Sequence, residues 1–304
     1  MPKSDDSSLK PDELRAVEER ARLLLDRADA WDRFPIPIDD LLGAAKVTVA
    51  PHSMFDPAQV LAYIKGKAET AAHNIKTALS KIWGIYDASE SLIHIDDSVV
   101  QSKQTFLMLH ETGHHDLPWH KKMFRIFQDC EQMLHPDIAD QFEREANNFA
   151  RFALFKGDRY QHMAADLEFG LKTPMKLAKT FGASLYASVR EFARTNARAC
   201  VVYVLERPEF VPGDGFRAEV RRIEPSPRFQ AEFGRPQDVV ITPTHTIGKL
   251  VPIGRKMTRP TTLMLTDLNG DQHECVGEAF DTTYNILVLV YPVKALNSTT
   301  IILN

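Results

Sequence analysis

Two histidines four residues apart, with a glutamate directly after the first, form the segment best suited to chemistry: His110-Glu111-Thr112-Gly113-His114. Residues four apart lie on the same face of an α-helix, so His110 and His114 can offer two imidazole nitrogens to one metal ion. Glu111 cannot easily bind the same ion, but its carboxylate can reach a water molecule on the metal and accept its proton. The spacing therefore predicts a zinc-dependent hydrolase with Glu111 as the general base.

A catalytic zinc needs a third protein ligand and an open coordination position. A second predicted helix has four residues at i, i+3, i+4 and i+7 spacing on one face: Glu143, Ala146, Asn147 and Ala150. Two alanines on that face allow a close approach of the two helices. We therefore expect Glu143 to bind the metal and Asn147 to hydrogen-bond one of the two imidazoles. Glu145 points about 200° away from Glu143 by helix geometry, which makes it the weaker ligand candidate.

Other side chains near the motif leave alternatives open. His115 turns about 100° away from His114, so we expect it to support the site or to lie at the surface. His115, His120 and Tyr160 are candidates for stabilising an oxyanion. We expect His135 to be a loop residue, with the role of a rival metal ligand as the lesser alternative. Manganese and iron are alternatives to zinc, because a site of two histidines and one glutamate accepts several divalent ions.

The elements around the motif follow from apolar periodicity and from helix and turn signals. Pro118 ends the motif helix, and the two strands before that helix have the spacing of a hairpin. We expect Leu92–Ile95 to be an edge strand, along which an extended substrate would bind by strand addition. Asp39 is the expected N-cap of a short helix that begins after Pro35. The sequence predicts helices over 11–30, 102–116, 137–155, 174–180 and 185–193, and strands over 46–50, 82–87 and 91–96.

After residue 199 the pattern changes from helical to extended. Asn269-Gly270 is a strong signal for a tight hairpin, whereas the Pro- and Arg-rich stretch 208–236 reads as mostly loop. Strands are predicted over 200–205, 261–266, 274–280 and 286–291. The fold class is therefore α+β, with a metallopeptidase core over 11–160, a helix-turn-helix-like segment over 161–198 and a mixed, β-rich C-terminal domain over 199–304, which could be a sensor or regulatory domain.

These motifs together resemble the signature of the ImmA/IrrE family of metallo-endopeptidases. His110-Glu-x-x-His114 is followed by Glu143-x-x-Ala146-Asn147-x-Phe149-Ala150, and Phe181-Gly-Ala-Ser184 resembles the helix-turn-helix-like segment that follows the family's peptidase core. The resemblance covers about residues 14–195. It implies a minimal thermolysin-like zincin core, with Glu143 as third ligand and Asn147 as its supporting partner. It also implies that the protein cleaves a helix-turn-helix repressor and that this cleavage switches on stress genes or mobile elements.

Composition narrows the alternatives. The net charge of −4 gives no basic field for coating nucleic acid, and Cys130, Cys200 and Cys275 form no C-x-x-C pair for a thiolate zinc site or a disulfide framework. No apolar N-terminal segment or membrane helix is visible, so we expect a cytoplasmic protein that does not bind membranes.

Two other functions compete with the peptidase: a non-enzymatic metal-binding regulator, and a transcription factor that binds DNA through residues 174–194. Only Arg190 and Arg194 are basic in the second half of that segment, and DNA recognition normally needs several phosphate contacts. We therefore expect the segment to pack against the protein rather than bind DNA directly.

Overall fold

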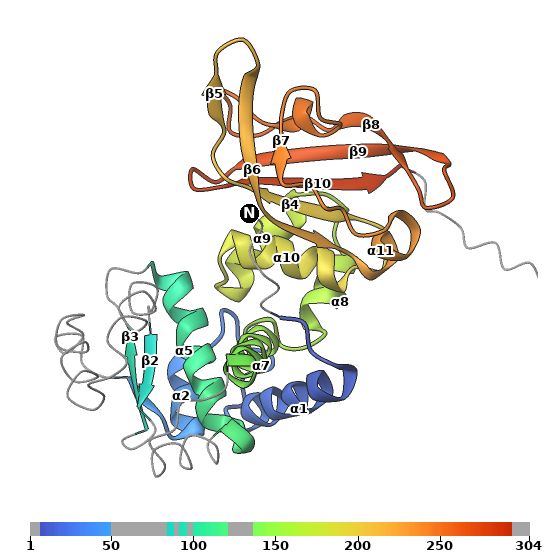
Figure 1. The fold of residues 1–304 in the computed structure, drawn as a ribbon. Coiled ribbons are helices and arrows are strands. Elements are labelled where there is room, and N and C mark those ends of the chain that lie inside the picture. Colours follow the sequence, from blue (N-terminus) through green and yellow to red (C-terminus); the bar gives the residue numbers. More distant parts are fainter. Residues whose placement is uncertain (1–6, 50–83, 88–90, 96–99, 121–135, 294–304) are drawn as a thin grey trace, which may run out of the picture. The chain divides into compact units, whose positions relative to one another are not determined.

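The computed structural model describes residues 7–49, 84–87, 91–95, 100–120 and 136–293, and the chain divides into two compact units (Figure 1). The first unit comprises Asp5–Arg159 and Lys179–Ala183. The second comprises Met1–Ser4, Tyr160–Ala178 and Ser184–Asn304. Compactness thus divides the chain near residue 160, and the functional division predicted at 161 and 199 stays a prediction. Among the described residues, no helix is long and apolar enough to cross a membrane.

Two helices begin the first unit. α1 (Pro11–Arg27) buries one apolar stripe that includes Val17, Ala21 and Leu24, as its periodicity predicts, but it ends three residues before the predicted end at residue 30. α2 (Ile38–Ala45) begins after Pro37, which occupies the N-cap position, so the prediction of Asp39 as the cap is wrong. Asp39 lies instead in the first turn, where its negative charge is favourable near the helix N-terminus.

A small three-stranded sheet follows, built from β1 (Thr48–Val49), β2 (Gly84–Asp87) and β3 (Leu92–Ile95). β2 and β3 pair antiparallel, as the predicted hairpin requires, and β1 pairs with β3 in parallel. The strand order is β1-β3-β2, so β3 is central and the prediction of an edge strand at Leu92–Ile95 is wrong. Within the described residues, β2 is an edge strand of this sheet.

Two long helices carry the predicted site. α5 (Gln101–Asp116) packs against β2, β3 and α7 (Pro136–Phe155), and α7 also packs against α1. Figure 1 shows α5 running between the small sheet and α7. Leu117 is extended, as expected for a residue before a proline, and this ends α5 at the predicted place; residues 118–120 are helical again.

The second unit contains the predicted helix pair and a large sheet. Three helices precede the strands: α8 (Arg159–Ala165), α9 (Lys172–Phe181) and α10 (Leu185–Thr195). Gly182 between α9 and α10 has a φ of +70°, and the Ser184 hydroxyl caps α10. The strands are β4 (Val201–Leu205), β5 (Glu209–Val211), β6 (Gly215–Pro225), β7 (Val240–Ile241), β8 (Thr261–Thr266), β9 (Gln272–Asp281) and β10 (Ile286–Pro292). α10 packs against β4 and β6.

The sheet is antiparallel, with the order β5-β6-β4-β10-β9-β8 and with β7 paired to β6. The prediction of a loop-heavy 208–236 is wrong, because this stretch forms β5, β6 and α11 (Pro227–Phe233). In the first part of β6, the small or apolar residues Phe216, Ala218 and Val220 alternate with exposed ones, a period of two that the many arginines hide. The short helix η2 (Gly248–Leu250) connects β7 to β8.

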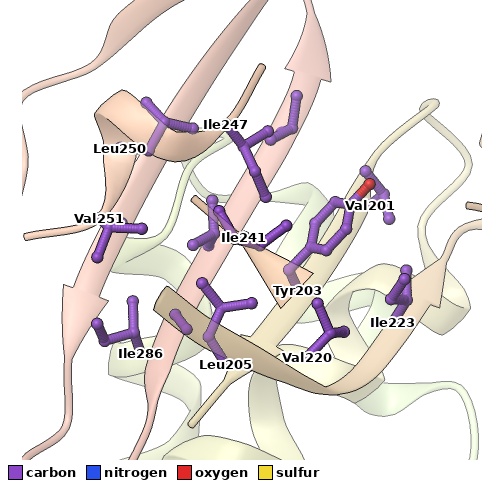
Figure 2. Packing of buried hydrophobic residues seen from close by; sticks show 14 of the residues in the cluster. Val201, Tyr203, Leu205, Val220, Ile223, Ile241, Ile247, Leu250, Val251 and Ile286 are labelled. Carbon is purple, nitrogen blue, oxygen red and sulfur yellow. The ribbon is translucent and has the colours of Figure 1, made fainter. Parts of the chain in front are cut away.

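One face of this sheet covers an apolar core. Figure 2 shows Tyr203 and Leu205 of β4 facing Val220 of β6, Ile241 of β7 and Leu250 of η2. All five residues of β4 are buried, because α10 packs near the strand as well. The thiols of Cys200 and Cys275 are also buried, and burial raises their pKa values to about 12 and about 11, in keeping with inert structural cysteines.

Candidate metal centre

The three side chains predicted as metal ligands converge. His110 Nε2 lies 3.3 Å from Glu143 Oε2, and His114 Nε2 lies 3.5 Å from Glu143 Oε1. The two imidazole Nε2 atoms are 3.3 Å apart. Ligand atoms of all three residues lie within 4.8 Å of one another, so this group could hold a metal ion. The histidines are buried while the Glu143 side chain is 59% exposed, so the group is open to solvent at the carboxylate.

The close approach of α5 and α7 depends on small residues at their contact. Ala146 and Ala150 are fully buried, in keeping with the predicted alanine face. Gly113 provides the matching surface on α5, since a Cβ atom there would lie 3.2 Å from Phe149 Cβ and 3.3 Å from Ala146 Cα. Gly113 therefore leaves room for the close approach of α7, the helix that carries Glu143.

Each imidazole has a hydrogen-bond partner on the side away from Glu143. His110 Nδ1 lies 3.1 Å from Asn147 Oδ1, as the sequence predicts for Asn147. His114 Nδ1 lies 3.1 Å from His120 Nδ1, and His120 Nε2 lies 2.7 Å from Glu145 Oε2. Because each motif histidine uses its Nδ1 atom for a hydrogen bond, its Nε2 atom faces Glu143. Metal-binding histidines usually have this arrangement, with one ring nitrogen toward the metal and the other hydrogen-bonded.

Electrostatics favours a positive charge among these three side chains. With Nδ1–H donated to Asn147, neutral His110 presents an electron pair at Nε2; His114 does the same if its Nδ1–H faces His120. Two nitrogen electron pairs and a carboxylate then face one another at 3.3–3.5 Å, and only a proton or a metal cation between them makes that arrangement favourable. The donor set fits a divalent cation such as zinc.

The pKa values agree with this description. Burial lowers the pKa of His114 to about 4, although Glu143 opposes the shift, so His114 is neutral at pH 7, the form in which an imidazole binds a metal. Burial opposes ionisation of His110, but its hydrogen bond to Glu143 and the charges of Glu111 and Glu143 outweigh burial and raise its pKa. Partial desolvation opposes ionisation of Glu143, but its hydrogen bonds to both histidines hold its pKa far below its ordinary value.

The second half of α5 is buried on all sides, although most of it is polar. Its buried run extends from Leu109 to Asp116 and includes Glu111, which is 7% exposed. Asp116 pairs with Arg20 at 3.2 Å and with Arg27 at 2.7 Å, which ties the end of α5 to α1. Burying a polar side chain lowers the stability of a protein unless that side chain has a hydrogen-bond or ion-pair partner, so this half of α5 depends on such partners.

Several predictions about neighbouring residues need revision. Tyr160 is fully buried and its hydroxyl donates to the Ser188 carbonyl, so it has no place in oxyanion stabilisation. His115 is only 9% exposed, so the alternative that it lies at the surface is wrong, while a supporting role stays a prediction. His135, the rival ligand, and Cys130 lie outside the described residues.

The contact between His120 and Glu145 was not predicted, since His120 was expected as an oxyanion candidate and Glu145 as a weaker metal ligand. The structure brings them together behind His114, both with almost no exposed surface. A sequence signal was present, because the same helix geometry that turns Glu145 away from Glu143 directs it toward another partner.

The two arginines of the helix-turn-helix-like segment are engaged elsewhere. Arg190 Nε lies 3.0 Å from Glu224 Oε2, and an Arg194 nitrogen lies 2.8 Å from the same oxygen. Their side chains are only 12% and 19% exposed. This arrangement agrees with the expectation that α10 packs within the protein.

Comparisons with known proteins give a fold and no family. No protein-family model matches the chain, and no curated protein matches it in sequence. Among solved structures, a Mycobacterium tuberculosis transcriptional regulator is similar with a TM-score of 0.51 and 10% identity, over 91% of this chain and 75% of that chain. At that identity the similarity concerns the fold alone.

Proposed function

We propose that this chain is a zinc-dependent endopeptidase, with His110, His114 and Glu143 as the metal ligands. The observation that supports the proposal most is the convergence of two imidazole nitrogens and a carboxylate within 4.8 Å, with a further buried glutamate directly after the first histidine. When bound, the divalent ion would act as a Lewis acid and lower the pKa of a bound water molecule.

Glu111 has the role of general base in this proposal. Its carboxylate accepts a proton from the attacking water and then passes that proton to the amine that leaves. Its negative charge already acts on the site, since it helps to raise the pKa of His110. Its position in the buried second half of α5, directly after the first ligand histidine, suits a base that acts on a water molecule at the ion.

The proposed substrate is a protein segment in extended conformation. β2 (Gly84–Asp87) packs on α5 and is an edge strand within the described sheet, so an extended chain could add to it by backbone hydrogen bonds. The resemblance in the motifs suggests a helix-turn-helix repressor as that substrate, and through it control of a stress response or of mobile elements. The solved neighbour is named a transcriptional regulator, which agrees with a regulatory role but does not define one.

Direct DNA binding through α9 and α10 is the second candidate, favoured by the helix pair with its glycine turn and by the name of the solved neighbour. Its weakness is that Arg190 and Arg194 are both held by Glu224. Salt-dependent binding of the purified chain to duplex DNA would favour this candidate over the peptidase.

Glu111→Gln tests the peptidase most selectively, because it keeps the shape of the side chain and removes the base. We expect the variant to bind as much zinc as the wild type and to cleave about 10²–10⁴ times more slowly. Cleavage can be followed by mass spectrometry on a purified helix-turn-helix repressor and on a peptide library, with and without chelator. Wild-type cleavage rates in the variant would contradict the role given to Glu111.

A further inference from the structure

We propose that His120 is a positioning residue for the metal centre: it accepts a hydrogen bond from His114 Nδ1–H and thereby holds the His114 ring with Nε2 turned toward the ion. This inference rests on the proposed metal site. His120 is six residues beyond His114 and lies outside the α5 helix, so the motif itself does not include it.

The direction of this hydrogen-bond chain follows from its last member. A carboxylate only accepts hydrogen bonds, and Glu145 receives three: from His120 Nε2, from Trp119 Nε1 and from Gln141 Nε2 at 2.9 Å. His120 must therefore carry its proton on Nε2. In a neutral imidazole the other nitrogen is then an acceptor, so His120 Nδ1 has an electron pair to offer.

That electron pair fixes the form of His114. The two Nδ1 atoms are 3.1 Å apart, which is hydrogen-bonding distance, so the proton between them belongs to His114. A neutral His114 with its proton on Nδ1 has an electron pair on Nε2, the atom that lies 3.5 Å from Glu143. The chain Glu145–His120–His114 thus selects the tautomer that a metal ligand needs.

The surroundings of His120 hold it rigidly. Its ring is fully buried and stacks on Phe142, with the ring centroids 4.0 Å apart and the planes 14° from parallel. Both ring nitrogens have partners, one in His114 and one in Glu145. With no exposed surface and with partners on both ring nitrogens, His120 is placed neither to ligate the metal nor to touch a substrate, so its contact with the metal centre is through His114.

The two ligand histidines are therefore supported in parallel ways. The His110 ring donates to an amide oxygen of Asn147, and the His114 ring donates to an imidazole nitrogen of His120. His120 is backed in turn by a buried carboxylate, which increases its basicity and so strengthens the hydrogen bond it accepts. Loss of either support leaves a ligand ring free to turn, at a cost in metal affinity.

Two substitutions at residue 120 separate positioning from packing. His120→Phe keeps a ring on Phe142 but has no nitrogen, whereas His120→Asn places an amide oxygen near the former Nδ1 atom and keeps an acceptor for His114. His162→Ala, which removes an exposed histidine from the second unit, is the matched control for nonspecific metal binding. The full-length variants are compared by zinc competition with a chromophoric chelator and by the absorption bands of bound Co²⁺.

We expect His120→Phe to bind zinc about 10–100 times more weakly than the wild type and to show altered Co²⁺ bands. His120→Asn should recover most of the affinity and the wild-type spectrum, although it loses the ring, and His162→Ala should match the wild type. Unchanged affinity and spectrum in His120→Phe would overturn the inference while leaving the metal site intact. Equal losses in both variants, in step with equal losses of apo-protein stability, would reduce His120 to a packing role. A wild-type chain that binds no zinc would overturn the inference and the metal site together.

Discussion

Gly113→Ala tests the idea that one missing side chain allows α5 and α7 to form the site. In an ordinary helix, replacing glycine by alanine stabilises the helix by about 1 kcal/mol. At Gly113 the new Cβ atom would lie 3.2 Å from two Phe149 atoms and 3.3 Å from Ala146 Cα. One of these neighbours is backbone, so α7 has to give by a few tenths of an ångström, and overpacking typically costs about 1–3 kcal/mol.

The net expectation is a free energy of unfolding that falls by about 0–2 kcal/mol, the overpacking cost less the gain in helix propensity. Gly43→Ala is the matched control, because Gly43 lies in α2 and, among the described residues, no atom beyond its own helix and chain neighbours lies within 4 Å of where a Cβ atom would be. That variant should be stabilised by about 0.5–1 kcal/mol. Urea unfolding of both variants, without metal and with unchanged slopes, gives the difference between them directly.

The same variant should also bind zinc more weakly than the wild type, since moving α7 withdraws Glu143 from the two imidazoles. Gly43→Ala should leave zinc binding unchanged. Stabilisation of Gly113→Ala as large as that of Gly43→Ala would refute this expectation, because the helices would then have room for the methyl group.

Two further variants test other parts of the description. Asp116→Asn should lower the free energy of unfolding by about 1–2 kcal/mol, measured by urea unfolding. The loss is smaller than for a fully buried ion pair because Arg20 and Arg27 are partly exposed. An unchanged urea midpoint would show that this contact between α5 and α1 contributes nothing to stability. Burial would raise the pKa of Glu224, but Arg194 and Arg190 outweigh it and hold the pKa below its ordinary value of 4.5. The stabilisation from Glu224 is therefore present above pH 4.5 and is lost as the pH falls through the lower pKa of the folded state. Glu224→Gln should therefore lose less stability on acidification than the wild type, measured as the free energy of unfolding against pH. Equal losses in the two proteins would contradict this prediction.

Local periodicity was sufficient for the residues that one helix brings together. His110 and His114 share a face because they are four residues apart on α5, and Asn147 lies one turn beyond Glu143 on α7. The meeting of α5 and α7 was also foreseeable, because small residues at helical spacing mark a close contact. What the pattern missed was the partner surface at Gly113, since a lone glycine in a motif has no periodicity.

Contacts that depend on a break in the chain or on pairing over long distances could not be predicted. Pro118 ends α5, so helix geometry counted from His114 no longer applies at His120, which burial against Phe142 places instead. β3 looked like an edge strand because β1, which covers its free side, is more than forty residues earlier in the chain. In β6 the arginines obscured a period-two pattern that becomes visible only once one face is known to be buried.

Zinc stoichiometry measured on the purified full-length chain tests the central claim most directly. We expect one zinc ion per wild-type chain by elemental analysis after dialysis, and none in His114→Ala or Glu143→Gln, with folded protein in each case by circular dichroism. A folded wild-type chain that retains no zinc, manganese or iron, or variants that retain as much metal as the wild type, would contradict the claim that these side chains hold one cation.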